Sequence, residues 1–293
     1  MQKHNKHNQV EALRWSLGSP PLVRSETDVR WQTDTWYRDL CDQPAMADDA
    51  SMADQLDHAL GQQTDHRLGA RFETLIAFGL SRLPALECVA RRLQIADDER
   101  TLGEFDFIVR NLADGTLEHW EVACKFYLGV FRDGELDWVG PGKRDSLRRK
   151  LSHLDDRQLR LSSRSEAQSA LPQPITRVRA ILKGRLFFPF GLPAASPSSF
   201  SFDGSAGHVT INPAAPHGTW CPIDTLCTIS PSAIHSLHKQ DWLAPRRTGA
   251  SLSLDRLQAA VESGPQCVDV ETSQGEWKRM FVVANDWSDD LAT

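Results

Sequence analysis

The sequence predicts an α/β protein with a mixed central sheet flanked by helices and a C-terminal extension. Three observations favour this fold class. A helical pattern over 65–83 is followed by two strand-like segments, 103–110 and 117–128, which a turn-forming run connects. An amphipathic helix over 146–161 and a further strand over 175–188 come next. Helices that alternate with strands in this way are typical of a sheet covered on both faces.

The composition excludes several classes of protein. With 293 residues, of which 40% are hydrophobic and 25% charged, the chain is long enough for a sizeable globular core. No apolar run approaches the roughly 18 residues of a membrane span. The first residues lack the apolar centre of a signal peptide, so we expect a cytoplasmic protein. The six cysteines form no Cys-x-x-Cys pair, which favours reduced thiols over a zinc site or a disulfide framework.

The first half of the chain contains a leader and two predicted helices. Residues 1–50 hold three of the nine tryptophans and predict an irregular leader that packs on the core. We expect the core to occupy 51–190 and to begin with a short helix over 53–60. The helix over 65–83 has apolar residues at near-helical spacing and ends before a proline, which cannot continue a helix. Glu73 interrupts the apolar surface of this helix.

The segments 103–110 and 117–128 predict the two strands of a hairpin. The run between them, Asn-Leu-Ala-Asp-Gly-Thr, has the composition of a turn. Residues 88–95 predict a further strand or an extended connection that leads into the hairpin.

Alternation of side chains between the faces of a strand gathers ionisable groups on the hairpin. Glu104 and Asp106 share a face of the first strand, and Glu121 and Lys125 share a face of the second. Carboxylates that lie close together raise one another's pKa unless a cation lies between them. Mg²⁺ binds one or two carboxylates together with waters and phosphate oxygens, so the hairpin predicts a metal site. The opposite faces are apolar and consist of Phe105, Phe107, Val109, Trp120, Val122, Cys124 and Phe126.

The helix after the hairpin is strongly basic. Residues 143–164 contain eight Lys or Arg and three Asp, a local charge of +5 in a chain whose net charge is −6. A local basic helix is typical of a phosphate-binding edge and equally of a solvated helix face, so charge alone leaves both open. Gln158 falls within the leucine stripe of this helix, and Lys150 lies at the edge of the stripe.

Residues 191–293 predict a C-terminal α+β extension or subdomain. The stretch 193–205 is rich in Ser, Pro and Ala, which indicates a loop or linker. The elements expected after it are strands over 207–211, 266–270 and 276–284 and a helix over 253–263. They form either a covering subdomain or a continuation of the central sheet.

Two stretches resemble a bacterial family known as domain of unknown function 1853. They are Arg-Thr-Leu-Gly-Glu-Phe-Asp-Phe at 100–107 and His-Trp-Glu-Val-Ala-Cys-Lys-Phe-Tyr-Leu-Gly at 119–129. Further similar stretches lie at 19–22, 150–154, 158–162, 182–184 and 241–245. The order of elements and the placement of the acids also resemble the PD-(D/E)XK restriction-endonuclease-like superfamily, which implies its αβββαβ core.

The resemblance to this superfamily implies ligands for Mg²⁺ (or Mn²⁺). Asp106 would be the central ligand, and Glu121 would be the second, helped by the backbone carbonyl of Val122. Glu104 would be a further ligand. Glu73 would hold a water outside the first shell of ligands.

The same resemblance implies that Lys125 orients or activates the attacking water. The usual Glu-x-Lys spacing would place the lysine at 123, where this chain has alanine. Lys125 keeps the same face of the strand but lies about 6–7 Å further along it.

Basic and polar residues of the following helix would contact the substrate. Gln158 and Lys150 match positions that support the site or the substrate in related nucleases. The flanking nucleic-acid backbone would be bound by Arg148, Arg149 and Arg160. Two aromatic residues, Trp138 and Tyr127, are candidates for base stacking, and core packing is the more common role of such residues.

These features predict a Mg²⁺-dependent phosphodiesterase that acts on DNA or RNA. A catalytically inactive protein that binds nucleic acid or a protein partner is the first alternative, and a purely structural scaffold is the second. Glu104 and Lys125 can also form a cross-strand ion pair worth about 0.2–1 kcal/mol. Gln158 can be a buried hydrogen-bonding residue, and His119 can be a satisfied strand histidine. The sequence does not define an oligomeric state.

Overall fold

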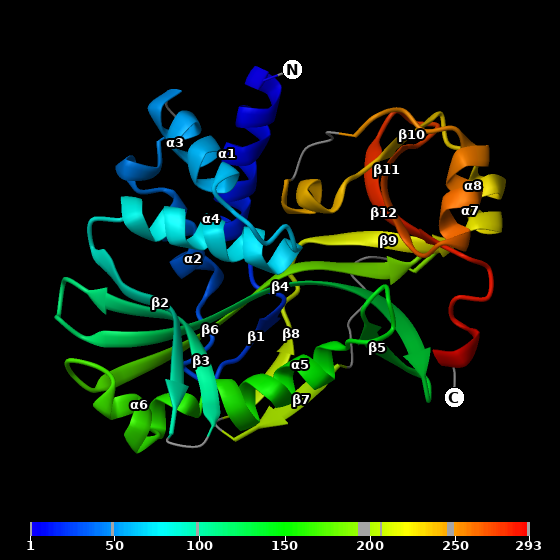
Figure 1. Ribbon diagram of the computed structural model, residues 1–293. Helices are drawn as coiled ribbons and strands as arrows, with labels where there is room; N and C mark the ends of the chain where they lie inside the picture. The colour runs from blue at the N-terminus through cyan, green and yellow to red at the C-terminus, as the bar shows by residue number, and fades with distance from the viewer. Residues whose placement is uncertain are drawn as a thin grey trace.

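A computed structural model describes residues 2–47, 50–97, 100–192, 200–205, 207–244 and 249–291. A mixed nine-stranded sheet forms its centre (Figure 1). The strands of this sheet are β2 (Leu86–Ala96), β3 (Thr101–Asn111), β4 (Leu117–Arg132), β5 (Glu135–Val139), β6 (Ile175–Pro189), β9 (His217–Pro222), β10 (Ala233–Ser236), β11 (Gln266–Glu271) and β12 (Trp277–Val283). Their order is β10-β11-β12-β9-β6-β4-β3-β2, and β5 pairs with β4 outside this path.

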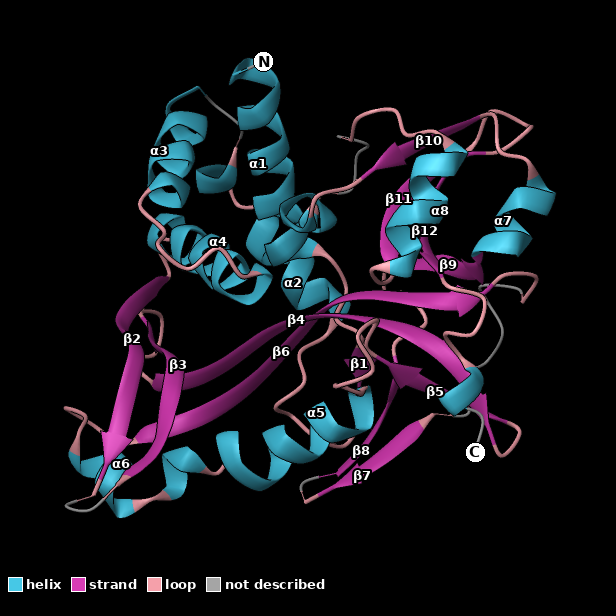
Figure 2. Cartoon of the chain, turned by 45° about the vertical axis from the view of Figure 1, so that its right-hand side comes forward, coloured by secondary structure: helices cyan, strands magenta, loops and turns pink. Residues whose placement is uncertain are grey.

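Helices cover both faces of the sheet (Figure 2). One face packs against α1 (Gln2–Gly18), α2 (Asp34–Cys41), α3 (Ala50–Gly61) and α4 (Leu68–Arg82). The other packs against α5 (Leu147–His153), a π-helical turn (Leu154–Gln158), a 3₁₀ turn (Leu161–Ser163) and α6 (Ser165–Ser169). The C-terminal strands pack against α7 (Ile223–Ile229) and α8 (Leu254–Glu262). Further 3₁₀ turns span Pro44–Met46, Lys239–Leu243 and Asp289–Leu291.

The α/β class and the mixed, helix-flanked central sheet are therefore confirmed. The strands β4 and β6 are parallel and are connected through α5, whereas β2, β3 and β4 form an antiparallel meander. A parallel pair needs such a crossover, because a short turn cannot return the chain to the same end of the sheet. None of the helices in the described part of the chain has the length and apolarity that crossing a membrane requires.

The region after residue 200 continues the central sheet. Of the two arrangements that the sequence left open, the structure has the second, because β9 pairs in parallel with β6 and β12 pairs with β9. The predicted loop over 193–205 is only partly described. Residues 193–199 lie outside the described residues, and β7 (Ser201–Gly204) is a strand where a loop was expected.

The leader is more regular than the sequence predicted. It contains the helices α1 and α2. Val10, Leu13 and Leu17 fall on one side of α1 and pack in the main core, which favours a helix there. A second sheet of three strands then connects β1 (Val23–Arg24) to β8 (Gly207–Ile211) and β7.

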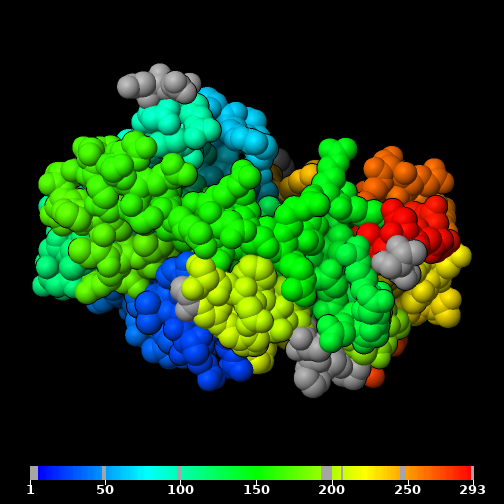
Figure 3. Space-filling model, turned by 90° about the horizontal axis from the view of Figure 1, so that it is seen from below, coloured from blue at the N-terminus to red at the C-terminus, as the bar shows by residue number. Residues whose placement is uncertain are grey.

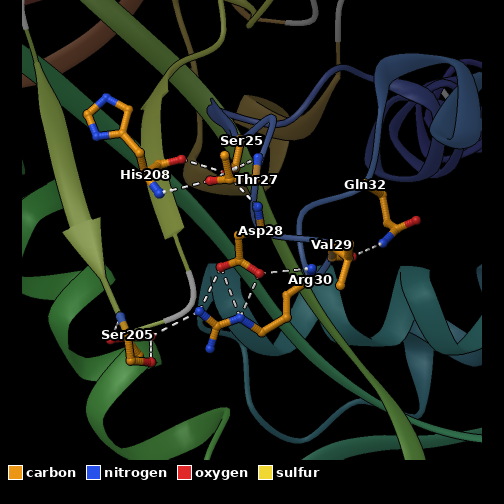
Figure 4. Close-up of polar contacts among 9 residues, drawn as sticks. Ser25, Thr27, Asp28, Val29, Arg30, Gln32, Ser205 and His208 are labelled. Carbon is orange, nitrogen blue, oxygen red and sulfur yellow. Dashed lines mark hydrogen bonds and ion pairs between the residues drawn. The ribbon is translucent and has the colours of Figure 1, made fainter.

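Charged side chains connect the segments next to this small sheet to the π-helical turn after α5. Figure 4 shows the carboxylate of Asp28 against the guanidinium of Arg30, whose Nη2 is 2.6 Å from Asp28 Oδ2. The same Nη2 lies 3.0 Å from Asp155 Oδ1, and Asp155 Oδ2 accepts a hydrogen bond of 2.7 Å from the backbone N–H of Ser205. Seen from below, α5 and the turn after it cross this face beside the β7–β8 hairpin (Figure 3).

The alternation predicted for β4 is confirmed. Trp120, Val122, Cys124 and Phe126 pack in the main core, and Ala123 packs in the cluster on the opposite face. Tyr127 and Trp138 also belong to that second cluster and are fully buried. Neither side chain is therefore available to stack on a base.

The alternation predicted for β3 holds only in part. Phe107 and Val109 join the main core, but Phe105 packs in a different cluster with Ile95 and Leu161. The change occurs where the β2–β3 ladder skips the pair formed by Arg92 and Asp106. Arg92 has a left-handed backbone at this position, with φ of 51°.

Candidate functional site

The central strand β4 has one edge that is unpaired in its middle. Its other edge pairs with β6 from Leu117 to Leu128. On the open side, β3 pairs only with 117–120 and β5 only with 128–132. Among the described strands, none pairs with residues 121–127 on this side. We call this stretch the β4 window; it is where Glu121 and Lys125 lie.

Asp106 lies at the fork where β3 leaves β4. Its Oδ2 accepts a hydrogen bond of 2.9 Å from the backbone N–H of Val122. The side chain of β3 thus replaces a backbone partner at the start of the β4 window. The N–H and C=O of one strand residue project to the same edge, so the carbonyl of Val122 also faces the fork.

Glu121 is the second acid of the site and is buried, with 1% of its surface exposed. Its Oε1 lies 2.8 Å from His119 Nε2, and its Oε2 accepts a hydrogen bond of 2.5 Å from Gln158 Nε2. Gln158 Oε1 in turn accepts a hydrogen bond of 2.9 Å from Lys150 Nζ. A continuous hydrogen-bonded chain therefore connects Lys150, Gln158, Glu121 and His119.

The helix that follows β5 presents Lys150 and Gln158 to the sheet. It begins at Ser146, whose Oγ accepts a hydrogen bond of 3.2 Å from the backbone N–H of Arg149. The predicted helix over 146–161 is interrupted by the π-helical turn, in which Leu159 N–H donates to Leu154 O at 2.9 Å. Such widened turns often occur at functional sites, and here the turn ends on Gln158, which faces Glu121.

The two acids are poorly compensated. Burial, followed by repulsion from Glu121, raises the pKa of Asp106 to about 8. Burial raises the pKa of Glu121 to about 7, against the opposing effects of Lys150 and of hydrogen bonds with Asp106. The pKa of His119 falls to about 3 because the ring is buried, so the ring is neutral and can donate from Nε2. Near neutral pH the two carboxyl groups therefore share a proton, as coupled acids do.

The structure does not bring Lys125 to the acid pair. Lys125 Nζ forms an ion pair of 2.6 Å with Asp145 Oδ2, and both side chains are about a third exposed, at 35% and 34%. The pair lines a cavity of about 430 Å³ beside Trp242. Lys150 is instead the lysine that acts electrostatically on both Asp106 and Glu121, and burial lowers its own pKa.

Glu104 and Glu73 lie at the periphery of the pair. Glu104 is exposed, and on β3 it faces Gln94 of β2. The cross-strand ion pair with Lys125 is therefore not formed. Glu73, on α4, accepts a hydrogen bond of 2.8 Å from Arg92 Nε. Both glutamates act on the acid pair through longer-range repulsion, Glu73 on Asp106 and Glu104 on Glu121.

The three arginines predicted to hold the substrate are exposed, and two of them contact groups other than the acids. Arg148 Nη1 donates to Ser201 O at 3.2 Å, and its guanidinium lies 5.0 Å from the ring centre of Phe200. Arg149 Nη1 donates to Arg144 O at 2.8 Å. Arg160 follows the π-helical turn and is exposed.

The polar groups at the fork are oxygen donors, the ligand type that hard divalent cations prefer. Among the described residues, no group of three His, Cys, Asp or Glu side chains is arranged to hold a metal ion. The available donors are the carboxylates of Asp106 and Glu121 and the carbonyl of Val122. All are oxygens, which Mg²⁺ and Mn²⁺ prefer. A dication would also replace the proton that the two buried acids share.

Sequence reasoning gave His119 little weight and missed Asp145. His119 is two residues before Glu121, so the alternation that placed Glu121 on its face also placed His119 there. Asp145 lies in the loop before α5, where no periodicity indicates a direction for the side chain. Its pairing with Lys125 depends on where that loop meets the β4 window.

Comparison with known proteins identifies a family without a defined function. The model of the family described as domain of unknown function (DUF1853) matches residues 11–283. No curated protein and no solved structure matches the chain.

Proposed function

This chain belongs to the family of domain of unknown function DUF1853, and we propose that it is a metal-dependent nuclease that hydrolyses phosphodiester bonds of DNA or RNA. The observation that carries the proposal is the buried acid pair, Asp106 and Glu121, at the fork of two central strands beside Lys150 and Gln158. Buried carboxylates with raised pKa values and a nearby lysine are typical of catalytic sites.

The order of elements supports a PD-(D/E)XK-like core. The succession α4, β2, β3, β4, α5, β6 corresponds to αβββαβ, with β5 inserted after the third strand. In this proposal the acid on β3 and the acid on β4 take the two carboxylate positions of the superfamily.

Asp106 and Glu121 would hold Mg²⁺ or Mn²⁺ together with the carbonyl of Val122. When bound, such an ion lowers the pKa of a coordinated water and offsets the charge of the phosphate. His119 and Gln158 fix the two oxygens of Glu121, so the carboxylate needs little reorganisation to act as a ligand.

We assign the lysine role to Lys150 in place of Lys125. Its Nζ is held by Gln158 and acts on both carboxylates, whereas Lys125 is neutralised by Asp145. The ammonium group of Lys150 would face the negative charge that develops on the phosphate. Ala123, in the usual lysine position, packs against the cluster to which Leu147 and Leu151 of the same helix belong.

The test is cleavage of labelled single- and double-stranded DNA and RNA with Mg²⁺ or Mn²⁺. Asp106→Asn and Glu121→Gln should each reduce the rate at least about 100-fold, because each removes a charged ligand without changing shape. Glu135→Gln, which removes an exposed carboxylate on β5, is the matched control and should cleave like the wild type. Equal rates in all four proteins, with no metal bound in calorimetry, would refute the proposal.

One observation favours a catalytically inactive protein that binds nucleic acid or a protein partner. Asp106 Oδ2 and both oxygens of Glu121 already accept hydrogen bonds from protein groups. Each carboxylate oxygen has a second lone pair that a metal ion could use. The two carboxylates nevertheless already have hydrogen-bond partners without a metal ion. This alternative predicts salt-dependent nucleic-acid binding that Glu121→Gln leaves unchanged.

A further inference from the structure

Two consecutive arginines on β2, Arg91 and Arg92, point to the same side of the sheet. Strand alternation would place neighbouring side chains on opposite faces. Arg92 has a left-handed backbone, with φ of 51°, and this reverses the alternation. Both arginines line a cavity of about 310 Å³ together with residues of α3 and α4, among them Ala59 and Thr74.

The left-handed backbone of Arg92 lies at the same gap in the β2–β3 ladder as Asp106. The β2–β3 ladder pairs Arg91 with Phe107 and Leu93 with Phe105, and it skips Arg92 and Asp106. A left-handed conformation is unfavourable for a residue that has a Cβ atom. Where the fold imposes such a conformation, a function often depends on it.

Arg91 and Arg92 share one carboxylate, that of Glu73, as their ion-pair partner. Glu73 Oε2 lies 2.7 Å from Arg92 Nη2 and 3.9 Å from Arg91 Nη2, so one carboxylate serves two guanidinium groups. Arg91 Nη2 otherwise donates to Thr74 Oγ1 at 3.2 Å. Asp65, which lines the cavity, forms its ion pair with Arg67, at 2.6 Å. Asp65 and Glu104 act on Arg92 only at longer range.

We propose that Arg91 and Arg92 form an anion site that binds a backbone phosphate of a nucleic-acid strand beside the acid pair. Guanidinium groups bind phosphate oxygens with paired hydrogen bonds, and adjacent arginines are suited to a doubly coordinated anion. The side chains keep access to solvent, at 31% exposure for Arg91 and 44% for Arg92.

The location connects this site to the candidate catalytic centre. Asp106 acts electrostatically on Arg91, and Glu73 acts on Asp106. A phosphate in the cavity would therefore belong to the strand whose neighbouring phosphate reaches the acids. The inference rests on the proposed function for the identity of the ligand, and it adds the residues that hold the strand outside the metal site.

The test measures binding of a labelled single-stranded oligonucleotide in EDTA, where no metal-dependent cleavage occurs, by fluorescence anisotropy at several salt concentrations. Arg91→Gln, Arg92→Gln and the double variant are compared with Arg256→Gln, which removes an exposed arginine of α8. The double variant should bind about tenfold more weakly, and its salt dependence should decrease by about 0.7 for each lost phosphate contact. Arg256→Gln should match the wild type, and Arg92→Lys should restore part of the affinity.

Oligonucleotides with and without a 5′-phosphate distinguish the two sources of the anion. Equal loss of affinity for both supports an internal phosphodiester, and loss confined to the phosphorylated strand contradicts it. Unchanged affinity and salt dependence in a double variant whose thermal unfolding matches the wild type would overturn the inference, even where cleavage is observed. Arginine-dependent binding without any cleavage would keep this inference and reject the nuclease.

Discussion

Glu118 and Glu121 lie three residues apart on β4 and are equally buried, at 0% and 1% exposure, but they face opposite sides of the sheet. Burial alone would raise the pKa of both. For Glu118, hydrogen bonds from Arg179 and Trp120 overcome the effect of burial and lower the pKa. For Glu121 the cation is Lys150, a longer contact through Gln158, and the pKa rises to about 7.

We therefore expect Glu118 to stabilise the fold, and Glu121 to serve the proposed function as a ligand. Arg179 Nε lies 2.5 Å from Glu118 Oε2, and Arg177 Nη1 lies 3.3 Å from Oε1. The charge of Glu118 is therefore matched inside the protein. Glu121 has instead an indirect connection to its cation, because Lys150 reaches it through Gln158. The predictions below address this contrast, in order of decreasing effect.

Glu118→Gln should destabilise the protein by about 3–5 kcal/mol, because it leaves the guanidinium of Arg179 without its buried partner. Glu121→Gln should change the free energy of unfolding by no more than about 1 kcal/mol, since it removes a charge that is poorly compensated. Urea unfolding of both variants measures the two values. Equal destabilisation would mean that both glutamates serve the fold in the same way.

Lys150→Met should reduce metal-dependent cleavage about 100-fold, the effect of removing one group that stabilises transition-state charge. Lys125→Met should leave the rate within a few-fold of the wild type, because the lysine is paired with Asp145. Single-turnover rates of the two variants make the comparison at equal change of charge. A larger loss of cleavage rate in Lys125→Met than in Lys150→Met would indicate that Lys125, on β4, has the role assigned to Lys150.

Without metal, the wild type should lose a few kcal/mol of stability as the pH rises from about 5 to 8. The buried neutral His119, whose pKa is lowered, offsets part of this loss because its contribution grows with pH. The raised pKa values of Asp106 and Glu121 mean that the folded protein binds their protons more tightly than the unfolded chain. Their contribution is therefore present at low pH and is lost as these groups ionise.

Thermal unfolding at several pH values, with and without Mn²⁺, measures this dependence. Mn²⁺ should restore stability at pH 8 and have little effect at pH 5, where protons occupy the acids. Asp106→Asn should flatten the pH dependence. A rise in stability between pH 5 and 8 in the absence of metal would contradict the shared-proton state.

The smallest expected effect concerns Glu73. Glu73→Gln should strengthen oligonucleotide binding a few-fold in EDTA, because it removes the carboxylate that competes with a phosphate for Arg92. Glu87→Gln is the matched control, since Glu87 also pairs with an arginine of the sheet, Arg110, at 3.0 Å. Weaker binding by Glu73→Gln alone would indicate that Glu73 orients Arg92 for the phosphate.

Local patterns predicted most elements and one face of the site. The hydrophobic spacing of 65–83 predicted α4, and alternation over 117–128 correctly placed Glu121, Ala123 and Lys125 opposite the main core. These results depend only on neighbours within one element. The assignment of the chain to its family also followed from short stretches of sequence.

The remaining features depend on partners that are distant in the chain. Lys183 becomes fully buried against Tyr37, and Glu118 finds Arg179 only once β6 aligns with β4. Phe105 and Arg92 depart from alternation where the β2–β3 ladder skips a pair of residues. The sequence of one strand alone does not specify how it pairs with the other. The π-helical turn before Leu159 likewise follows from packing against the sheet and from no residue pattern.

The continuity of the sheet past β6 has a consequence for work with shortened chains. A protein ended after residue 190 would lack β9, leaving the edge of Leu186–Pro189 that pairs with β9 open. It would also lose Phe281, whose ring centre lies 4.7 Å from that of Phe187. An unpaired strand edge beside an exposed aromatic residue promotes aggregation. Expression of the first 190 residues alone should therefore give insoluble material, and the part that contains the acid pair is best studied with its C-terminal strands attached.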